Sequence, residues 1–224
     1  MARSYEKHKP YFELVEALER SKGCALCAMR KRSTRRYAET LLYENINDPQ
    51  FRRRLRDARG FCKPHAKDIL ECGDGLSAAI LYQDQVEDTL QFLARLEGMT
   101  RRALRKKARA EWIRHEPCPL CEHEEETDIM RIETLRNHLD DPELRQALEK
   151  GPGFCVPHLI PTLERLKDPE HRRYVERLHR EKLSRLLDEL HEFIRKHDYR
   201  HTHESYGREA DSWQRAPRML LGDF

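Results

Sequence analysis

Apolar residues recur at helical spacing in successive segments of the chain, and short polar stretches separate these segments. Tyr11, Leu14, Val15 and Leu18 follow the spacing of three and four residues that is typical of an amphipathic helix. The same spacing holds in three further groups: Tyr37, Leu41, Leu42 and Ile46; Ile129, Ile132, Leu135 and Leu139; and Tyr174, Leu178, Leu186, Leu190 and Phe193. The pattern predicts an all-α protein.

Two more segments follow this pattern and are expected to be helices. One extends over about 76–96, and its apolar stripe, which we expect to face the core, consists of Ala79, Ile80, Val86, Leu90 and Leu93. The other extends over 101–115, with Trp112 packed inward. Three Asp-Pro steps, at Asp48-Pro49, Asp141-Pro142 and Asp168-Pro169, suit an N-cap followed by proline in the first helical turn.

Two motifs occur twice in the same order. Cys24-Ala25-Leu26-Cys27 and Gly60-Phe61-Cys62-Lys63-Pro64-His65 recur as Cys118-Pro119-Leu120-Cys121 and Gly153-Phe154-Cys155-Val156-Pro157-His158. The second copy begins 94 residues after the first, and its second motif lies 93 residues after its counterpart. The chain is therefore predicted to be an internally duplicated helical bundle.

The duplication predicts three regions. Residues 1–98 form a first helical repeat and residues 99–198 a second, each with its own Cys-x-x-Cys and Cys-x-x-His site. Residues 199–224 form a C-terminal segment, in which Trp213, Met219, Leu220 and Leu221 are expected to dock on the bundle as a short final helix.

The repeated motifs have the composition of metal sites. Zinc in structural sites takes four Cys or His ligands in a tetrahedron, and Cys3His is a common set. Two ligands three residues apart at the start of a helix project from the same face, where the helix N-terminus favours the thiolate form of cysteine. The expected ligands are Cys24, Cys27, Cys62 and His65 in the first repeat and Cys118, Cys121, Cys155 and His158 in the second. The sequence thus predicts two zinc ions per chain.

Several alternatives to this assignment stay open, among them thiol redox chemistry and plain buried cysteines without a metal. An iron–sulfur cluster prefers four cysteines but also accepts histidine. The ligand pairs can also be exchanged, so that the Cys-x-x-Cys of one repeat meets the Cys-x-x-His of the other. The same eight residues would then bind metal, and each site would join the two repeats.

Other reactive residues are given structural roles. Glu122 to Glu126 follow the second Cys-x-x-Cys, where the first repeat has Ala28 to Arg32, and this difference favours a solvated helix face over a catalytic base. Cys72 is expected to be a buried free thiol. The group of His197, His201 and His203 is expected to be solvated rather than to bind metal.

Charge and cysteine content narrow the class of protein. The chain has 43 basic and 40 acidic residues, so it lacks the strong positive field of a dedicated nucleic-acid-binding protein. No stretch is apolar enough for a signal peptide or a membrane span, which predicts a cytoplasmic protein without membrane contact. Seven cysteines in a reducing compartment indicate metal binding rather than disulfides.

The two copies of Cys-x-Leu-Cys, Asp-Pro and Gly-Phe-Cys-x-x-His are followed by Lys196-His197-Asp198-Tyr199-Arg200 and by a segment from Ser212-Trp213 to Leu221-Gly222. With these motifs the chain resembles, over nearly its whole length, an uncharacterised bacterial family of unknown function. The resemblance implies that the eight ligands and the Tyr-Arg segment belong to a recurrent design, and it implies no activity.

Three functions compete at this point. The first is an interaction or regulatory module with a protein partner, because two structural metal sites make a helical scaffold rigid without a catalytic centre. The second is a redox or metal sensor that uses zinc thiolates or an iron–sulfur cluster. The third is nucleic-acid binding by the basic runs at Arg30 to Arg36, Arg52 to Arg56 and Arg101 to Arg109. An enzyme has the least support, because no nucleophile–base pair or phosphate-binding loop is recognisable.

Overall fold

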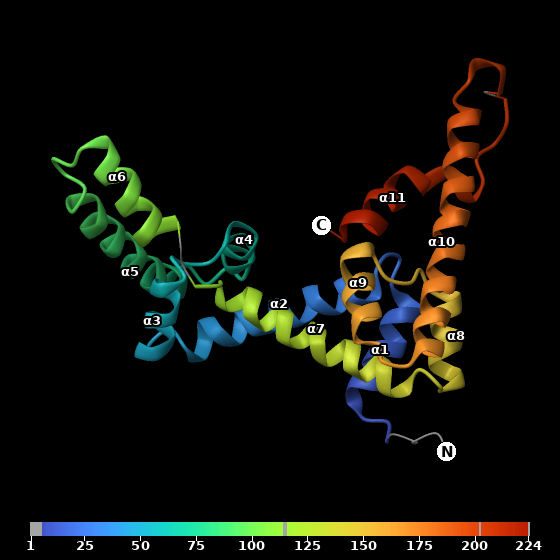
Figure 1. Ribbon diagram of the computed structural model, residues 1–224, viewed down its shortest axis with the longest axis horizontal. Helices are drawn as coiled ribbons and strands as arrows, with labels where there is room; N and C mark the ends of the chain where they lie inside the picture. Colours follow the sequence, from blue (N-terminus) through green and yellow to red (C-terminus); the bar gives the residue numbers. More distant parts are fainter. Residues whose placement is uncertain (1–5, 114–115, 202, 224) are drawn as a thin grey trace. The chain divides into compact units, whose positions relative to one another are not determined.

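The computed structural model describes residues 6–113, 116–201 and 203–223, and these residues form helices and turns without a β-strand (Figure 1). The predicted all-α class is confirmed. The α-helices are α1 (Lys9–Arg20), α2 (Ala25–Glu44), α3 (Pro49–Asp57), α4 (Lys63–Glu71), α5 (Gly75–Ala94), α6 (Arg101–Ala108), α7 (Pro119–His138), α8 (Pro142–Lys150), α9 (Val156–Arg165), α10 (Pro169–Lys196) and α11 (Ser212–Leu221). A π-helical segment, η1 (Arg109–Ile113), follows α6, and two 3-10 turns, η2 (Tyr199–His201) and η3 (Arg208–Asp211), lie between α10 and α11. Position 115, where the sixth helix was expected to end, lies outside the described residues.

The three Asp-Pro steps begin helices as predicted. Asp48, Asp141 and Asp168 are the N-caps of α3, α8 and α10, and each carboxylate accepts a hydrogen bond from the backbone N–H two residues later, at 2.8 to 3.0 Å. Proline occupies the first turn in each case, where its missing N–H costs no hydrogen bond. These caps position the short helices α3 and α8, which precede the two Cys-x-x-His motifs.

The helices belong to two compact units. One unit is the continuous stretch Arg32–Glu126, and the other combines the chain up to Lys31 with the chain from Thr127 onward. The units therefore do not follow the predicted boundaries at residues 98 and 198. The reason is that α2 and α7, the 20-residue helices that begin at the Cys-x-x-Cys motifs, each contribute residues to both units.

The discontinuous unit has a core built from α1, the first turns of α2, the second half of α7, and α8, α9 and α10. Helix α1 packs along α8. The largest fully buried side chains here are those of Tyr11, Leu14, Leu18, Leu26, Leu135, Leu139 and Phe154. Helix α11 packs on α10 and α9. The N- and C-terminal parts of the chain thus share one hydrophobic core.

The continuous unit has its own core. Helix α5 packs on α3 and α4. Its buried side chains come from the second half of α2, from α3, α4 and α5, from the connection before α4, and from the start of α7. They are Ala38, Leu41, Leu42, Phe51, Leu55, Phe61, Ile69, Ala78, Leu81 and Leu120. Trp112 of η1 stacks on Phe92 of α5, with ring centroids 4.9 Å apart, as its predicted inward packing requires.

Two predicted apolar surfaces are placed differently from expectation. On α5, Val86, Leu90 and Leu93 are 57%, 61% and 55% exposed, and the core is contacted by Ala78, Leu81 and Phe92 instead. On α11, Trp213, Leu220 and Leu221 are also exposed, whereas Ser212 is fully buried. The spacing marks an apolar face, but it does not show which face of a helix another element covers.

Candidate metal centres

Each repeated motif lies at the N-terminus of a helix. Cys24 and Cys118 directly precede α2 and α7, and Cys62 and Cys155 are the N-cap residues of α4 and α9. Cysteine is an unusual residue at an N-cap, and the side chains of Cys62 and Cys155 make no capping hydrogen bond. The free N–H groups and the helix dipole instead favour negatively charged sulfur at these ends.

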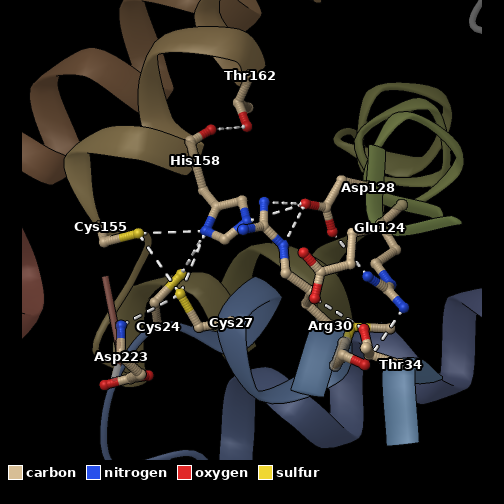
Figure 2. Close-up of polar contacts among 12 residues, drawn as sticks. Cys24, Cys27, Arg30, Thr34, Glu124, Asp128, Cys155, His158, Thr162 and Asp223 are labelled. Carbon is tan, nitrogen blue, oxygen red and sulfur yellow. Dashed lines mark hydrogen bonds and ion pairs between the residues drawn. The ribbon is translucent and has the colours of Figure 1, made fainter. Parts of the chain in front are cut away.

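The first cluster, called site 1 from here on, consists of Cys24, Cys27, Cys155 and His158 (Figure 2). Nδ1 of His158 lies 3.5 Å from Sγ of Cys24, 3.4 Å from Sγ of Cys27 and 3.2 Å from Sγ of Cys155. The Sγ atoms of Cys27 and Cys155 are 3.7 Å apart. All four side chains are buried.

The second cluster, site 2, consists of Cys62, His65, Cys118 and Cys121. Nδ1 of His65 lies 3.2 Å from Sγ of Cys62, 3.5 Å from Sγ of Cys118 and 3.4 Å from Sγ of Cys121. The Sγ atoms of Cys62 and Cys121 are 3.6 Å apart. Cys62 and Cys121 are only partly buried here.

All eight predicted residues are thus gathered four at a time, but the pairs are exchanged. The Cys-x-x-Cys of each predicted repeat meets the Cys-x-x-His of the other, so a site within residues 1–98 and another within 99–198 are not what the structure contains. The division of the chain explains this correction. Cys24 and Cys27 belong to the discontinuous unit together with Cys155 and His158, whereas Cys62 lies in the continuous unit.

The donor geometry suits a single tetrahedral ion in each cluster. Bonds of about 2.3 Å to sulfur and about 2.0–2.1 Å to nitrogen place tetrahedral donors about 3.8 Å apart for two sulfurs and about 3.6 Å apart for sulfur and nitrogen. The observed distances of 3.6 and 3.7 Å, and of 3.2 to 3.5 Å, lie close to these values. Both Cys/His groups can therefore hold a metal ion.

Each histidine is held by a carboxylate of α7. Nε2 of His158 lies 3.1 Å from Oδ2 of Asp128, and Nε2 of His65 lies 3.1 Å from Oε1 of Glu124. When Nε2–H donates to the carboxylate, Nδ1 keeps its lone pair for a metal, an arrangement common around zinc-binding histidines. Glu124 was expected on a solvated helix face, and Asp128 was not singled out at all. The sequence did contain a signal for Glu124, because acidic residues follow the second Cys-x-x-Cys at 122–126 whereas 28–32 after the first contain none.

The surroundings of the two carboxylates differ. Asp128 is buried and also accepts hydrogen bonds from Nε of Arg30, at 2.7 Å, and from Nη1 of Arg131, at 2.7 Å. Glu124 is half-buried and accepts a hydrogen bond from the hydroxyl of Thr34 at 2.9 Å. Asp128 therefore pairs with two guanidinium groups in addition to orienting its histidine.

Hydrogen bonds among the donors of site 1 shift the pKa values of its histidine and of two of its thiols. Burial lowers the pKa of His158, but its hydrogen bonds with Asp128, Cys155 and Cys27 raise it more, to about 11. Hydrogen bonds with Cys155 and Cys27 raise the pKa of Cys24, and hydrogen bonds with Cys155 and Cys24 lower the pKa of Cys27. Without a metal, a proton on the imidazole balances the thiolate. A metal ion would displace this proton, so binding would release protons.

Site 2 has the same character. Burial lowers the pKa of His65, and its hydrogen bonds with Cys118 and Glu124 raise it to about 10. Burial raises the pKa of Cys118, but His65 and nearby backbone N–H groups lower it to about 7. Burial and the hydrogen bond with Cys62 raise the pKa of Cys121 to about 12. One thiol of the cluster thus ionises near neutral pH.

The C-terminal end of the chain lies against site 1 (Figure 2). The backbone N–H of Asp223 donates to Sγ of Cys27 at 3.4 Å. Gly222 is buried with φ of +95°, and a Cβ atom there would lie 3.5 Å from Sγ of Cys27 and 3.7 Å from Sγ of Cys155. A Cβ atom at Gly23 would lie 2.5 Å from a carboxylate oxygen of Asp223, so this side chain would have to move.

The remaining candidate residues do not join either cluster. Cys72 is a free, half-buried thiol whose Sγ lies 3.3 Å from the carbonyl oxygen of Asp68. The described histidines near the end of α10 also do not gather: Nδ1 of His197 contacts the carbonyl oxygen of Phe193, His201 contacts Glu204, and His203 is exposed.

Several arginines of the basic runs have acidic partners. Arg52 and Arg56 both bind Asp84, and Arg54 binds Glu122. These pairs reduce the positive charge that the run at 52–56 presents to solvent.

None of the described helices has the length and apolarity needed to cross a membrane. A 23.9 kDa uncharacterised protein, encoded in the 3' region of xynA in Caldicellulosiruptor sp. strain Rt8B.4, is 27% identical over 201 residues, which are 89% of this chain and 95% of that protein. No solved structure matches the chain. Residues 9–224 match the family of unknown function DUF6062, and the chain belongs to this family.

Proposed function

We propose that the protein is a zinc-stabilised helical interaction module, with one structural zinc ion in site 1 and one in site 2. The observation that carries the proposal is the complete Cys3His donor set of each cluster, with distances that fit tetrahedral zinc. A catalytic zinc keeps one position open for water, whereas four protein donors converge in both clusters. The ligands are Cys24, Cys27, Cys155 and His158, and Cys62, His65, Cys118 and Cys121.

The donor spacing favours zinc over an iron–sulfur cluster. In a cluster the protein ligands bind different iron atoms, so donors on opposite sides stand farther apart than donors that share one ion. All donor atoms of each Cys/His group lie within 4.8 Å of one another. This spacing suits a single ion.

The internal repeat and a cytoplasmic location belong to the same proposal. Helices α2 and α7 both have 20 residues, α3 and α8 both have nine, and both short helices begin at an Asp-Pro step. This correspondence supports a duplication. The seven cysteines are all free of disulfides, which supports a reducing compartment.

The exposed stripe of α5 supports an interaction role. Leu76, Val86, Leu90 and Leu93 are 73%, 57%, 61% and 55% exposed, and Val86, Leu90 and Leu93 project from one face of the helix. Clustered apolar side chains on a surface are typical of protein-binding sites. A scaffold held by metal keeps such a helix face in place for a protein partner.

Metal content tests the first half of the proposal. Protein purified without added metal should contain about two zinc ions per chain and show no visible absorption band. Removal of zinc by a chelator should cause loss of helical circular dichroism, because the binding energy of a structural metal is also folding energy. A brown protein with iron, or a fully folded protein without metal, would contradict it.

The stripe of α5 tests the second half. The double variant Val86→Lys with Leu90→Lys should lose a partner that cross-links to the wild-type protein, while zinc content and helicity remain unchanged. Leu187→Lys is the matched control, because Leu187 is 52% exposed on α10 in the other unit. Equal cross-linking by all three proteins would rule out the stripe as a docking surface.

A further inference from the structure

A cationic pocket lies beside site 1 in the discontinuous unit. It has a volume of about 220 Å³ and is bounded by the end of α8, the middle of α10, η3, α11 and the residues just before Cys24. Seven basic and two acidic side chains line it. The basic side chains are those of Lys22, Lys150, Lys182, Arg185, Arg208, Arg215 and Arg218.

Both acidic residues of the wall have partners. Glu189 forms an ion pair with Arg215, and the carboxylate of Glu149 accepts a hydrogen bond from the hydroxyl of Tyr174 at 3.1 Å. Among the described residues, no carboxylate lies within ion-pair distance, 4.0 Å, of five of the basic groups: Lys22, Lys150, Arg185, Arg208 and Arg218. The lining of the pocket therefore carries more positive than negative charge, with seven basic side chains against two acidic ones.

Two hydrogen bonds hold the side chain of Lys182 in place in the wall of the pocket. Its Nζ donates to the carbonyl oxygens of Glu149 and Gly151, at 2.8 and 2.6 Å, at the C-terminal end of α8. These contacts hold the half-buried Lys182 side chain of α10 against the C-terminal end of α8. A positive group held in this way does not need to be ordered when an anion arrives.

We propose that this pocket binds a small organic phosphate. Arginine side chains match the oxygens of phosphate with paired N–H donors, and several cationic groups around one concave site favour a multiply charged anion. Leu186, Met219 and Pro152 supply an apolar part of the wall for the organic portion of the ligand. The volume is below the roughly 300–1,000 Å³ of drug-sized sites, which limits the ligand to a small molecule.

The shape of the pocket favours a small ligand over nucleic acid. A nucleic-acid backbone is followed by an extended groove of basic groups. Here the basic groups of α8, α10 and α11 surround one concave volume.

Binding to the zinc-loaded, full-length protein tests the proposal. Glycerol 3-phosphate, pyrophosphate and inorganic phosphate are titrated by calorimetry at constant ionic strength. We expect saturable binding of glycerol 3-phosphate that is tighter than the binding of pyrophosphate or inorganic phosphate, and weaker binding of glycerol 3-phosphate than of both inorganic anions would contradict an organic ligand. Arg185→Gln and Arg218→Gln should each weaken it about tenfold, the loss expected for one charge-assisted hydrogen bond.

A matched control separates local from general charge effects. Arg180→Gln removes an exposed charge of α10 that does not line the pocket, and it should leave the affinity unchanged. Melting temperature and zinc content establish that each variant is folded. The proposal is overturned by the absence of saturable binding up to 10 mM, roughly the weakest affinity of interest, or by an equal loss in Arg180→Gln. It is also overturned if a mixed oligonucleotide binds more tightly than every small phosphate and is lost in the same two variants.

Discussion

Site 1 and site 2 have the same donor set but different surroundings. The four side chains of site 1 are buried, its histidine is held by a buried aspartate that also binds two arginines, and the N–H of Asp223 covers one sulfur. In site 2 the sulfurs of Cys62 and Cys121 are partly exposed, and the carboxylate of Glu124 is supported by the hydroxyl of Thr34. Identical ligands can therefore produce a shielded and an accessible centre in one chain.

The difference indicates which residues control the rate at which a bound metal would exchange with solution. Ligand identity fixes the preferred metal and its geometry, whereas the residues around the ligands control their orientation and the access of water and competitors. We expect a competing chelator to remove metal from site 2 before site 1.

Paired cysteine substitutions give the largest expected effect, because they test whether the two sites are distinct as described. Cys24→Ser with Cys155→Ser removes two donors of site 1 and should leave about one zinc per chain, tightly bound in site 2. Cys24→Ser with Cys62→Ser removes one donor from each site and should weaken both. The measurement is zinc content after dialysis against a chelator.

Ligand pairs that combined within each repeat would give the reverse result. Cys24→Ser with Cys62→Ser would then leave one zinc, and Cys24→Ser with Cys155→Ser would weaken both. Cys72→Ser is the control, because this thiol lies outside both clusters and its loss should leave two zinc ions.

The supporting carboxylates should show a smaller effect of unequal size. Asp128→Asn is expected to lower the zinc affinity of site 1 by about 10- to 100-fold, the usual range for such partners, since it also leaves Arg30 and Arg131 less well neutralised. Glu124→Gln should lower the affinity of site 2 by about tenfold or less, because an amide oxygen can still accept from Nε2–H.

Competition with a chromogenic chelator measures both affinities. Glu125→Gln is the matched control on the same helix, since Glu125 is exposed. An effect of Glu125→Gln as large as that of Glu124→Gln would show that general charge, rather than orientation of His65, determines the affinity.

The N-cap of α8 in the discontinuous unit is supported by a tyrosine of α1. The hydroxyl oxygen of Tyr11 lies 2.7 Å from Asp141 and 2.9 Å from Glu143, so its single proton is shared between these two carboxylates and ties α1 to the start of α8. Burial raises the pKa of Asp141, but the hydrogen bonds from Lys7 and Tyr11 lower it more, to about 2. Tyr11→Phe should reduce the free energy of unfolding by about 1.5 kcal/mol at neutral pH.

The pH dependence of this effect follows from the lowered pKa. The unfolded chain binds a proton at Asp141 near pH 3.8, whereas the folded chain does so near pH 2. The contribution to stability is therefore complete above about pH 4 and is lost as the pH falls toward 2. Urea unfolding at several pH values checks this. An effect of Tyr11→Phe that grew on acidification would contradict it.

The smallest expected effect concerns the C-terminal end. A chain that stops after Leu221 lacks the N–H of Asp223 that donates to Cys27. Loss of one weak hydrogen bond, worth about 0.5–1 kcal/mol, should speed the release of zinc from site 1 by about threefold. Release from site 2 should not change, because site 2 lies in the other unit. Stopped-flow release into a chelator would show whether both rates change together.

The sequence predicted the helices, their Asp-Pro caps and the residues of both clusters, because these depend on local spacing. Cys24, Cys27 and their repeats lie three residues apart at helix starts, which is a property of a few neighbouring positions. The pairing of Cys24 with Cys155 rather than with Cys62 could not be predicted. Both combinations give the same Cys3His chemistry, so spacing within each motif does not distinguish them.

The α5 stripe and the histidine partners were missed for related reasons. The spacing of Val86, Leu90 and Leu93 marks a face, but burial depends on whether another element covers it. Glu124 and Asp128 reach His65 and His158 only because exchanged pairing brings α7 beside α4 and α9. Contacts of this kind depend on the topology of the whole chain.

The order of the eight ligands along the chain has a consequence for how the protein is made. Cys62 and Cys121 are 59 residues apart and lie inside the 128-residue interval from Cys27 to Cys155, so the two sites are nested. During synthesis, Cys24, Cys27, Cys62 and His65 leave the ribosome first, and together they already form a complete Cys3His set. A metal ion bound at that stage would hold the wrong pair of motifs together. For the proposed zinc ions, correct assembly therefore favours uptake after residue 121 has emerged, when site 2 can close and shorten the loop that site 1 still has to close.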